Sequence, residues 1–122
     1  MLVLDTNIVI AYFAEEEKVV HALEDALESG EELIVPTIVK AETLSYSDID
    51  PVVLERIRAW FKETRLVTLD SMIAERTADI RRATKLKLID SIIAATALSM
   101  QAKLVTRDTD FTRVVELEIM EW

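Results

Sequence analysis

Cysteine is absent from this sequence of 122 residues, and histidine occurs once, as His21. Without cysteine there can be no disulfide, no thiolate zinc site and no thiol nucleophile. A single histidine also argues against a metal site built from histidines and against a serine–histidine–aspartate triad. Any chemistry must therefore come from carboxylates, hydroxyls, amides, lysine or arginine.

Glycine is almost as scarce, since Gly30 is the only one. Loops that cradle phosphates in P-loop and dinucleotide-binding proteins need several glycines, so both kinds of site are excluded. The sequence also lacks an apolar run of the roughly 18 residues that span a bilayer, and a basic stretch before Leu2 that would begin a signal peptide. We expect one soluble, cytoplasmic domain over residues 1–122, with no membrane association.

Charge is plentiful but unevenly distributed along the chain. The formal net charge is −9, yet residues 1–50 carry 12 acidic and 2 basic residues, whereas residues 51–122 carry 11 acidic and 12 basic residues. The densest basic stretch is "RRATKLK", a pattern typical either of a solvated helix end or of a surface that binds phosphates. Its basic residues are Arg81, Arg82, Lys85 and Lys87.

Short apolar segments alternate with amphipathic ones along the chain. The segments that favour buried strands are residues 2–4, 32–36, 65–69, 103–106 and 116–120. The segments with helical spacing are residues 7–14, 17–29, those after Thr37 and after Pro51, 70–85 and 91–101, with a helical turn at 111–115. This alternation predicts an α/β domain with a three-layer α/β/α architecture and a central parallel sheet of four to five strands.

The helix after the second strand decides where Glu42 points. Thr37 is a suitable N-cap for it, and Ile38, Ala41 and Ser45 would share its inward face. Glu42 follows Ala41 and lies one turn after Ile38, so it would border that face. Burying a carboxylate without a partner is costly, so something positive should meet Glu42 there, and Lys40 projects from a different side of the helix.

Three more acidic residues stand at the ends of apolar segments. Asp5 ends the first strand and Asp108 follows "KLVT", so both would lie at the carboxyl edge of a parallel sheet, where ligands bind. Asp90 precedes the most apolar helix, is suited to cap it, and would reach the same edge. Together with Glu42 these carboxylates suit a hard cation, Mg²⁺ or Mn²⁺.

Four segments resemble the signature segments of the PIN domain family of metal-dependent ribonucleases. They are "LVLDTN", "VKAE", "LIDSIIAATAL" and "LVTRDTDF", in the family's order and spacing over nearly the full chain. Among small members, the chain most resembles the VapC-like toxins of prokaryotic toxin–antitoxin pairs. The resemblance implies a parallel sheet flanked by helices, an acidic metal pocket, hydrolysis of RNA phosphodiester bonds, a homodimer and a small antitoxin partner.

By position, the resemblance assigns the family's acidic residues to Asp5, Glu42, Asp90 and Asp108, and a hydroxyl that lines the pocket to Thr106. No side chain here is an obvious activated nucleophile, so we expect water activated by one or two cations to attack the phosphate. The expected metal ligands, direct or through water, are Asp5, Asp90 and Asp108. Glu42 would be a ligand or orient the attacking water. The residues expected around the ligands are Thr6, Asn7, Thr106 and Asp110.

The last motif leaves a choice, because both Asp108 and Asp110 are acidic. We favour Asp108 for the metal because it follows the strand directly, and Asp110 as the cap of a short helix at Phe111. The side chains expected to contact phosphates on either side of the pocket are Arg81, Arg82, Lys85, Lys87 and Arg107.

Other functions remain open for this sequence. One is a Mg²⁺-dependent phosphatase or phosphate-accepting domain with Asp5 as the nucleophile, although "LDTN" and "LVTRD" lack the second Asp or later Lys that such proteins usually need. Another is a catalytically silent PIN scaffold that only binds proteins. Tyr12, Phe13 and Tyr46 are candidates for an exposed groove that takes a partner helix.

Overall fold

The short apolar segments assemble into a single parallel sheet. The computed structural model describes all 122 residues. Five strands pair in the order β3-β2-β1-β4-β5, and every neighbouring pair is parallel. The strands are β1 (Leu2–Leu4), β2 (Leu33–Pro36), β3 (Arg65–Val67), β4 (Lys103–Val105) and β5 (Ile119–Met120). The predicted parallel sheet of four to five strands is confirmed.

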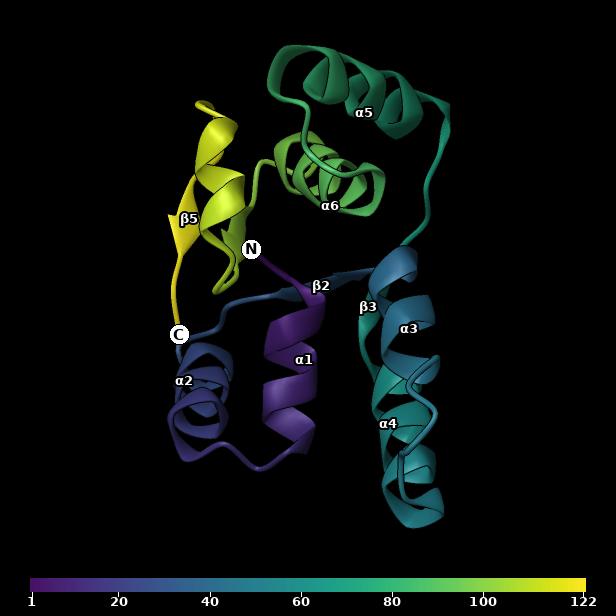
Figure 1. Cartoon of the computed structure of the whole chain (residues 1–122). Helices are drawn as coiled ribbons and strands as arrows, with labels where there is room; N and C mark the ends of the chain where they lie inside the picture. The colour runs from purple at the N-terminus through teal and green to yellow at the C-terminus, as the bar shows by residue number, and fades with distance from the viewer.

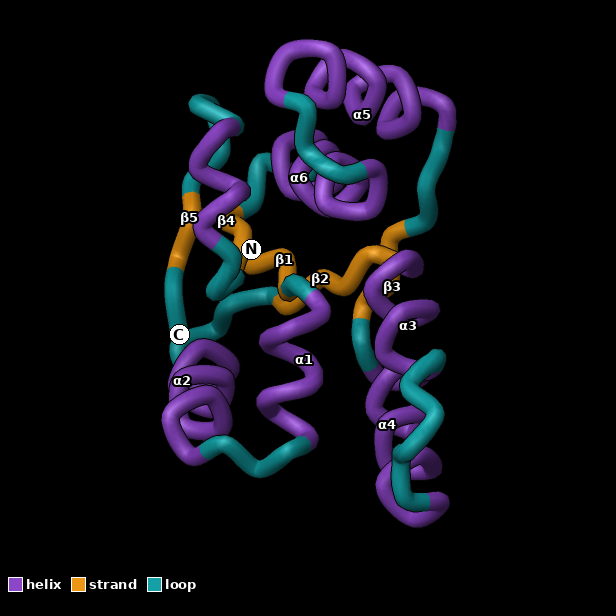
Figure 2. The backbone as a smooth tube through the Cα atoms, in the orientation of Figure 1, coloured by secondary structure: helices purple, strands orange, loops and turns teal.

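Helices cover both faces of this sheet. They are α1 (Thr6–Phe13), α2 (Glu17–Glu28), α3 (Thr37–Leu44), α4 (Pro51–Glu63), α5 (Ser71–Thr84), α6 (Leu88–Ser99) and the 3₁₀ helix η1 (Thr109–Arg113). In Figure 1, α1 to α4 lie on one face and α5 and α6 lie on the other. Figure 2 shows the strands as the layer between them, so the three-layer architecture is confirmed. None of these helices is long and apolar enough to cross a membrane.

Helix α6 is largely apolar and has no polar face. Residues 91–97 are all buried, because α6 packs against β1 and β4 on one side and against α5 on the other. A helix covered on both sides needs apolar or small residues around its whole circumference. The prediction of a helix sandwiched in the interior is therefore confirmed.

The strand order creates a crevice at one point of the sheet. Strand β1 pairs with β2 on one side and with β4 on the other. The helices that follow β1, α1 to α4, and the helices that precede β4, α5 and α6, lie on opposite faces of the sheet. In open parallel sheets this switch point leaves a crevice at the carboxyl ends of the two strands, where ligands bind. Asp5 directly follows β1, and Thr106 directly follows β4.

Two helix starts differ from the prediction. Helix α3 already includes Thr37, and Pro36 occupies its N-cap position with an extended backbone. Helix α6 begins at Leu88 with Lys87 as its N-cap, so Asp90 lies within the first turn and does not cap the helix. Asp90 still lies where the positive end of the helix dipole favours an anion.

The inward face of α3 was also predicted wrongly. Val39 and Thr43 are its buried residues, whereas Ala41 and the C-cap residue Ser45 are exposed. Thr43 can be buried because its hydroxyl donates to the carbonyl oxygen of Val39 at 2.8 Å, which satisfies the polar group locally. Glu42, next to Thr43, still borders the inward face and is half-buried.

Candidate active site

Asp5 is the most buried carboxylate of the crevice, with 5% of its surface exposed. It ends β1 and at the same time caps α1, because Oδ1 accepts a hydrogen bond from the backbone N–H of Thr6 at 2.7 Å. Its second oxygen, Oδ2, accepts a hydrogen bond from the Thr106 hydroxyl at 2.6 Å. Both oxygens are therefore held by neutral donors, and no cation is paired with them.

The surroundings of Asp5 disfavour its charge. Burial raises the pKa of Asp5, and the hydrogen bonds from Thr106 and Thr6 oppose that rise. The nearby charges of Asp108 and Glu42 raise the pKa further, so the net direction is upward. A buried carboxylate with an opposite charge beside it would show the reverse.

Glu42 reaches the same crevice from α3, which packs against α1. Its Oε1 accepts a hydrogen bond from the Thr6 hydroxyl at 2.6 Å. Within the chain, the partner of Glu42 is thus a neutral hydroxyl, and the expectation that a divalent cation meets this carboxylate stays a prediction. Lys40 lies on another side of α3, with Nζ 5.9 Å from the centre of the Phe61 ring.

Asp90 approaches from the first turn of α6 and is partly exposed. Burial is the main cause that raises the pKa of Asp90 to about 6, and repulsion from Asp5, Asp108 and Glu42 adds to it. Lys87 lowers the pKa only in part. These mutual effects show that the four carboxylates, predicted from separate segments, are close enough to repel one another.

Asp108 is tied to the crevice through Thr106. The backbone N–H of Asp108 donates to the Thr106 hydroxyl at 3.0 Å, and that hydroxyl in turn donates to Asp5. Asp108 also caps η1, because its Oδ1 accepts the backbone N–H of Asp110 at 2.9 Å. The prediction that Asp110 caps this helix is therefore wrong. The Asp110 side chain instead lies 3.6 Å from the guanidinium of Arg113.

Asn7 adds an unsatisfied polar group beside these acids. It follows Thr6 in the first turn of α1, and its Oδ1 is the only buried side-chain nitrogen or oxygen without a hydrogen-bond partner. Buried polar atoms are nearly always paired, so an isolated amide oxygen calls for water or an ion as its partner.

The residues fit a hard cation by chemistry and not by a preformed arrangement. The donors are carboxylate, amide and hydroxyl oxygens, which Mg²⁺ and Mn²⁺ prefer. No group of three or more acidic or histidine side chains is arranged so that it could hold a metal ion as it stands. Carboxylates that repel one another keep apart, so a cation would have to draw the partly exposed Asp90 and Asp108 inward.

The predicted phosphate-binding cations occupy different surroundings. Arg81 Nε donates to the carbonyl oxygen of Leu86 at 3.3 Å, and Arg82 forms an ion pair with Asp79. Lys85 ends α5 in the left-handed conformation and is exposed, like Lys87. Of this group, Lys87 is the one whose charge acts on Asp90.

Arg107 is engaged elsewhere. Its Nη1 and Nη2 donate to the two carboxylate oxygens of Glu16 at 2.9 and 2.8 Å, and its Nε donates to the carbonyl oxygen of Trp122 at 3.0 Å. Glu16 lies 91 residues away in the sequence, and no local pattern announces this pairing.

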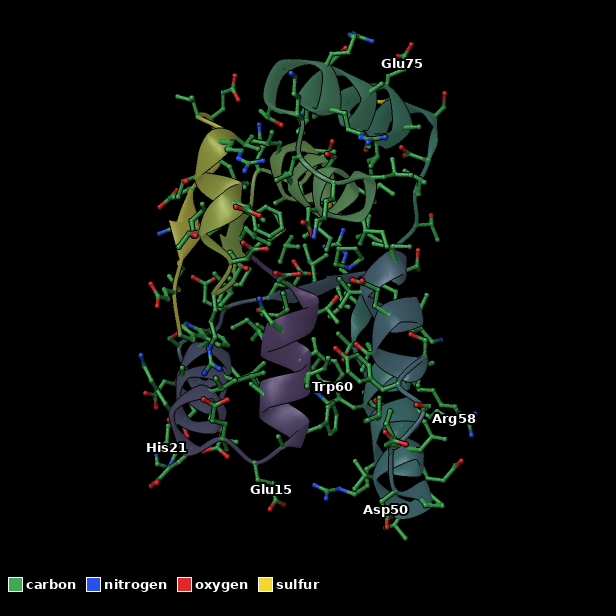
Figure 3. The ribbon with its side chains drawn as sticks, in the orientation of Figure 1. Glu15, His21, Asp50, Arg58, Trp60 and Glu75 are labelled. Atoms are coloured by element: carbon green, nitrogen blue, oxygen red, sulfur yellow. The ribbon has the colours of Figure 1, made fainter.

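An apolar groove of about 200 Å³ lies between α1, α3 and α4. Phe13 and Tyr46 line it, together with Ile10, Val53 and Ile57. Tyr12, which was expected with them, instead packs against Trp60, with 6.0 Å between the ring centres. In Figure 3, Trp60 lies between α1 and α4.

Comparison with known proteins identifies the fold. The family model of the PIN domain matches residues 2–117. The chain is similar to a toxin–antitoxin complex from Klebsiella pneumoniae, with a TM-score of 0.77 and 29% identity over 91% of this chain and 90% of that chain. It is also similar to VapBC2 of Rickettsia felis bound to a promoter DNA fragment, with a TM-score of 0.86 and 19% identity over 99% of this chain and 98% of that chain.

A third similar structure is VapBC-1 from nontypeable Haemophilus influenzae, with a TM-score of 0.83 and 22% identity over 99% of this chain and 97% of that chain. A search of curated protein sequences finds no significant match. The family model covers nearly the whole chain, and the fold agrees with the VapC-like resemblance seen in the sequence. The chain belongs to the PIN domain family.

Proposed function

We propose that this chain is a divalent-metal-dependent ribonuclease and the toxin of a VapBC-like toxin–antitoxin pair. The observation that carries this proposal is the group of four carboxylates around the switch point of the sheet, none of which is in an ion pair. Burial and repulsion raise the pKa of Asp5 and Asp90. Perturbed carboxylates in a crevice favour a functional site, and PIN domains are generally nucleases.

The four carboxylates would have different roles in this reaction. Asp5, Asp90 and Asp108 would hold Mg²⁺ or Mn²⁺, with Asp5 as the fixed member because both its oxygens are held by hydrogen bonds. When bound, the cation would supply positive charge for the scissile phosphate and would lower the pKa of the attacking water. Glu42 would complete the ligand set or orient that water. The Oδ1 of Asn7 would accept a hydrogen bond from water in the same pocket.

Substrate binding would depend on the cation. Four unpaired carboxylates repel phosphate until a dication reverses the local charge. Arg81, Lys85 and Lys87 are not in ion pairs and would contact phosphates beside the pocket. Arg82 and Arg107 would first have to exchange Asp79 and Glu16 for phosphate.

The apolar groove is the proposed site for the antitoxin. The similar structures are described as toxin–antitoxin or VapBC complexes, and a helix with an apolar face is the natural occupant of such a groove. Tyr46 and Phe13 would be the anchors, because Tyr46 is 57% exposed in the free chain. Tyr46→Glu should abolish capture of an antitoxin without changing RNA cleavage.

A homodimer is also part of the proposal. Leu69 and Met72 are 50% and 75% exposed at the start of α5, and neighbouring exposed apolar side chains favour a protein contact. Light scattering after size exclusion should give twice the mass of the chain. Met72→Glu should then give the monomer mass.

The proposed function is tested with the purified chain and a labelled single-stranded RNA. We expect degradation with Mg²⁺ or Mn²⁺, none with EDTA, and none with Asp5→Asn in either metal. The matched control is Glu32→Gln, which removes an acid from the opposite edge of the sheet. Turnover of para-nitrophenyl phosphate without RNA cleavage would favour a phosphatase, and activity on neither would leave a protein-binding scaffold.

A further inference from the structure

Most of the lysine and arginine side chains that form no ion pair within the chain lie at two places. Of the 14 lysine and arginine side chains, half are in ion pairs. The others are Lys18, Lys40, Lys62, Arg76, Arg81, Lys85 and Lys87. Three of these lie at the turn between α5 and α6, which the sequence already suggested. Lys40 and Lys62 form the second place, which the sequence did not suggest.

Lys40 and Lys62 line a groove of about 310 Å³ between α3 and α4, here called the α3–α4 groove. Its lining is Lys40 and Leu44 from α3, and Glu55, Arg58, Ala59 and Lys62 from α4. Arg58 and Lys62 are four residues apart and therefore share one face of α4. Figure 3 shows Arg58 on the outer side of α4, away from α1.

The α3–α4 groove has a positive balance. Glu55 is its one acid, and it pairs with Arg58 at 2.8 Å on the exposed face of α4. Such an exposed pair adds little stability, so Arg58 can exchange Glu55 for another anion. Lys40 is held in place, because its Nζ lies over the Phe61 ring. The region is otherwise acidic, since residues 1–50 hold 2 basic and 12 acidic residues.

The α3–α4 groove and the carboxylate pocket are on different sides of the same helix. Glu42 faces α1 through its hydrogen bond with Thr6, and Lys40 precedes it by two residues, or about 200° around the helix. On the other side of the pocket, Lys87 acts on Asp90 at the start of α6, and α6 packs against α3. Cations therefore flank the acidic pocket on two sides.

We propose that the α3–α4 groove binds backbone phosphates of the RNA strand whose scissile phosphate lies in the carboxylate pocket, a proposal that rests on the proposed function. A helix is about 10 to 12 Å across with its side chains, and single-strand sites commonly take about 4 to 16 nucleotides. One strand can thus run from Lys87 over the pocket and across α3 to Lys40 and Lys62. A phosphate chain fits this surface better than an acidic protein segment. Only its scissile phosphate has to enter the acidic pocket, where a cation would compensate its charge, and its other phosphates lie against basic side chains.

The test compares two pairs of substitutions that remove the same charge. Lys40→Gln with Lys62→Gln removes the two unpaired cations of the α3–α4 groove, and Lys18→Gln with Arg76→Gln removes unpaired cations from α2 and α5. The probe is a fluorescent oligouridylate of 12 nucleotides, and anisotropy gives its Kd over a range of salt with Ca²⁺ in place of Mg²⁺, so that a dication fills the pocket while binding is measured without cleavage. We expect the groove pair to raise Kd about tenfold and to lower the slope of log Kd against log salt by about 1.4, since each single-strand phosphate contact contributes about 0.7.

The control pair should leave both Kd and slope close to wild type. An unchanged slope in the groove pair, the same change in both pairs, or no RNA binding by the wild type would overturn the proposal. Loss of affinity for an oligoglutamate peptide with unchanged RNA affinity would also overturn it. Lys62→Gln alone, at an exposed position, should lower the slope by about 0.7 and guards against a folding defect at Lys40.

Cleavage separates this proposal from the proposed function. Cleavage of a dinucleotide RNA with Mg²⁺ or Mn²⁺ should be the same for the groove pair and wild type, because its only phosphate lies in the pocket and none reaches the groove. If wild type cleaves and the groove pair binds the 12-nucleotide RNA normally, the groove proposal fails alone. If the groove pair loses binding and wild type never cleaves, the proposed function fails alone.

Discussion

The two edges of the same sheet treat acidic residues in opposite ways. At the amino edge, three acids close to strand starts each pair with a cation. Glu31 pairs with the N-terminal ammonium at 2.9 Å, Glu32 with Arg65 at 2.6 Å, and Glu118 with Lys103 at 2.9 Å. At the carboxyl edge, Asp5, Glu42 and Asp108 have hydroxyl or backbone N–H partners. Neither these three acids nor Asp90 is in an ion pair.

This difference separates charges that the fold satisfies from charges that it leaves for something else. The amino-edge carboxylates are exposed and locally compensated, so they need no ligand. The carboxyl-edge acids repel one another, and burial and repulsion raise the pKa of Asp5 and Asp90. Structural stability alone would not select that arrangement, which is the physical reason to look for a cation there.

The largest expected contrast comes from removing one charge at each edge. Asp5→Asn should lower metal-dependent RNA cleavage at least 100-fold, because several kcal/mol of transition-state stabilisation depend on the cation. Without metal, its thermal stability should equal or exceed that of wild type, because one repulsive charge is gone. Initial cleavage rates and thermal melts in EDTA measure both. A clear loss of stability in metal-free Asp5→Asn would contradict the picture of repelling carboxylates.

The next largest effect is expected for metal binding when Thr106 is replaced. Thr106→Val removes the hydroxyl that accepts from Asp108 and donates to Asp5, and we expect about 10- to 100-fold weaker Mn²⁺ binding, the usual range for residues that orient ligands. Calorimetric titration with Mn²⁺ measures it, and Thr106→Ser should restore it. The matched control is Thr77→Val, another buried threonine whose hydroxyl bonds only to Ile73 of its own helix. Equal effects of Thr106→Val and Thr77→Val would mean that Thr106 only packs.

The strand ends were predictable from the sequence, because they depend on local composition. An apolar run that stops at Asp5 or at "TRD" marks the carboxyl end of a buried strand, and parallel topology then brings these ends together. The face of α3 was not predictable in this way. In a helix of eight residues, Ile38 and Ala41 and Val39 and Thr43 give patterns of similar strength, and the hydrogen bond that lets Thr43 be buried appears only in the folded chain.

Long-range pairing was equally out of reach. Arg107 looked available because it adjoins Asp108, but its partner Glu16 comes from the other end of the chain. The α3–α4 groove was missed because Lys40 stands alone in an acidic stretch and its neighbour Lys62 belongs to the next helix. The helix caps expected at Thr37 and Asp90 were predicted wrongly for a smaller reason. Helices extend by a residue or a turn wherever the flanking residues permit it.

Asp90 gives a pH-dependent contrast between the edges. Its pKa is raised to about 6 in the folded chain from an ordinary 3.8, so between these values the folded state binds more protons than the unfolded state. Stability therefore falls as pH rises from about 4 to 6, by about 1 to 2 kcal/mol after allowance for solvent screening of this partly exposed group. Asp90→Asn should remove this fall, and at pH 7 without metal it should melt about 4 °C or more above wild type. If the Tm values of the two proteins changed in parallel across that pH range, Asp90 would not be the group that causes the fall in stability.

The smallest effect is expected at the amino edge. Glu32→Gln breaks an ion pair whose side chains are 47% and 49% exposed, so it should cost less than about 1 kcal/mol of unfolding free energy. Urea unfolding at low and high salt measures this, and the difference from wild type should shrink as salt screens the pair. RNA cleavage should not change. A loss of cleavage would mean that the two edges of the sheet are coupled. The acids at the carboxyl edge would then not differ in function from those at the amino edge.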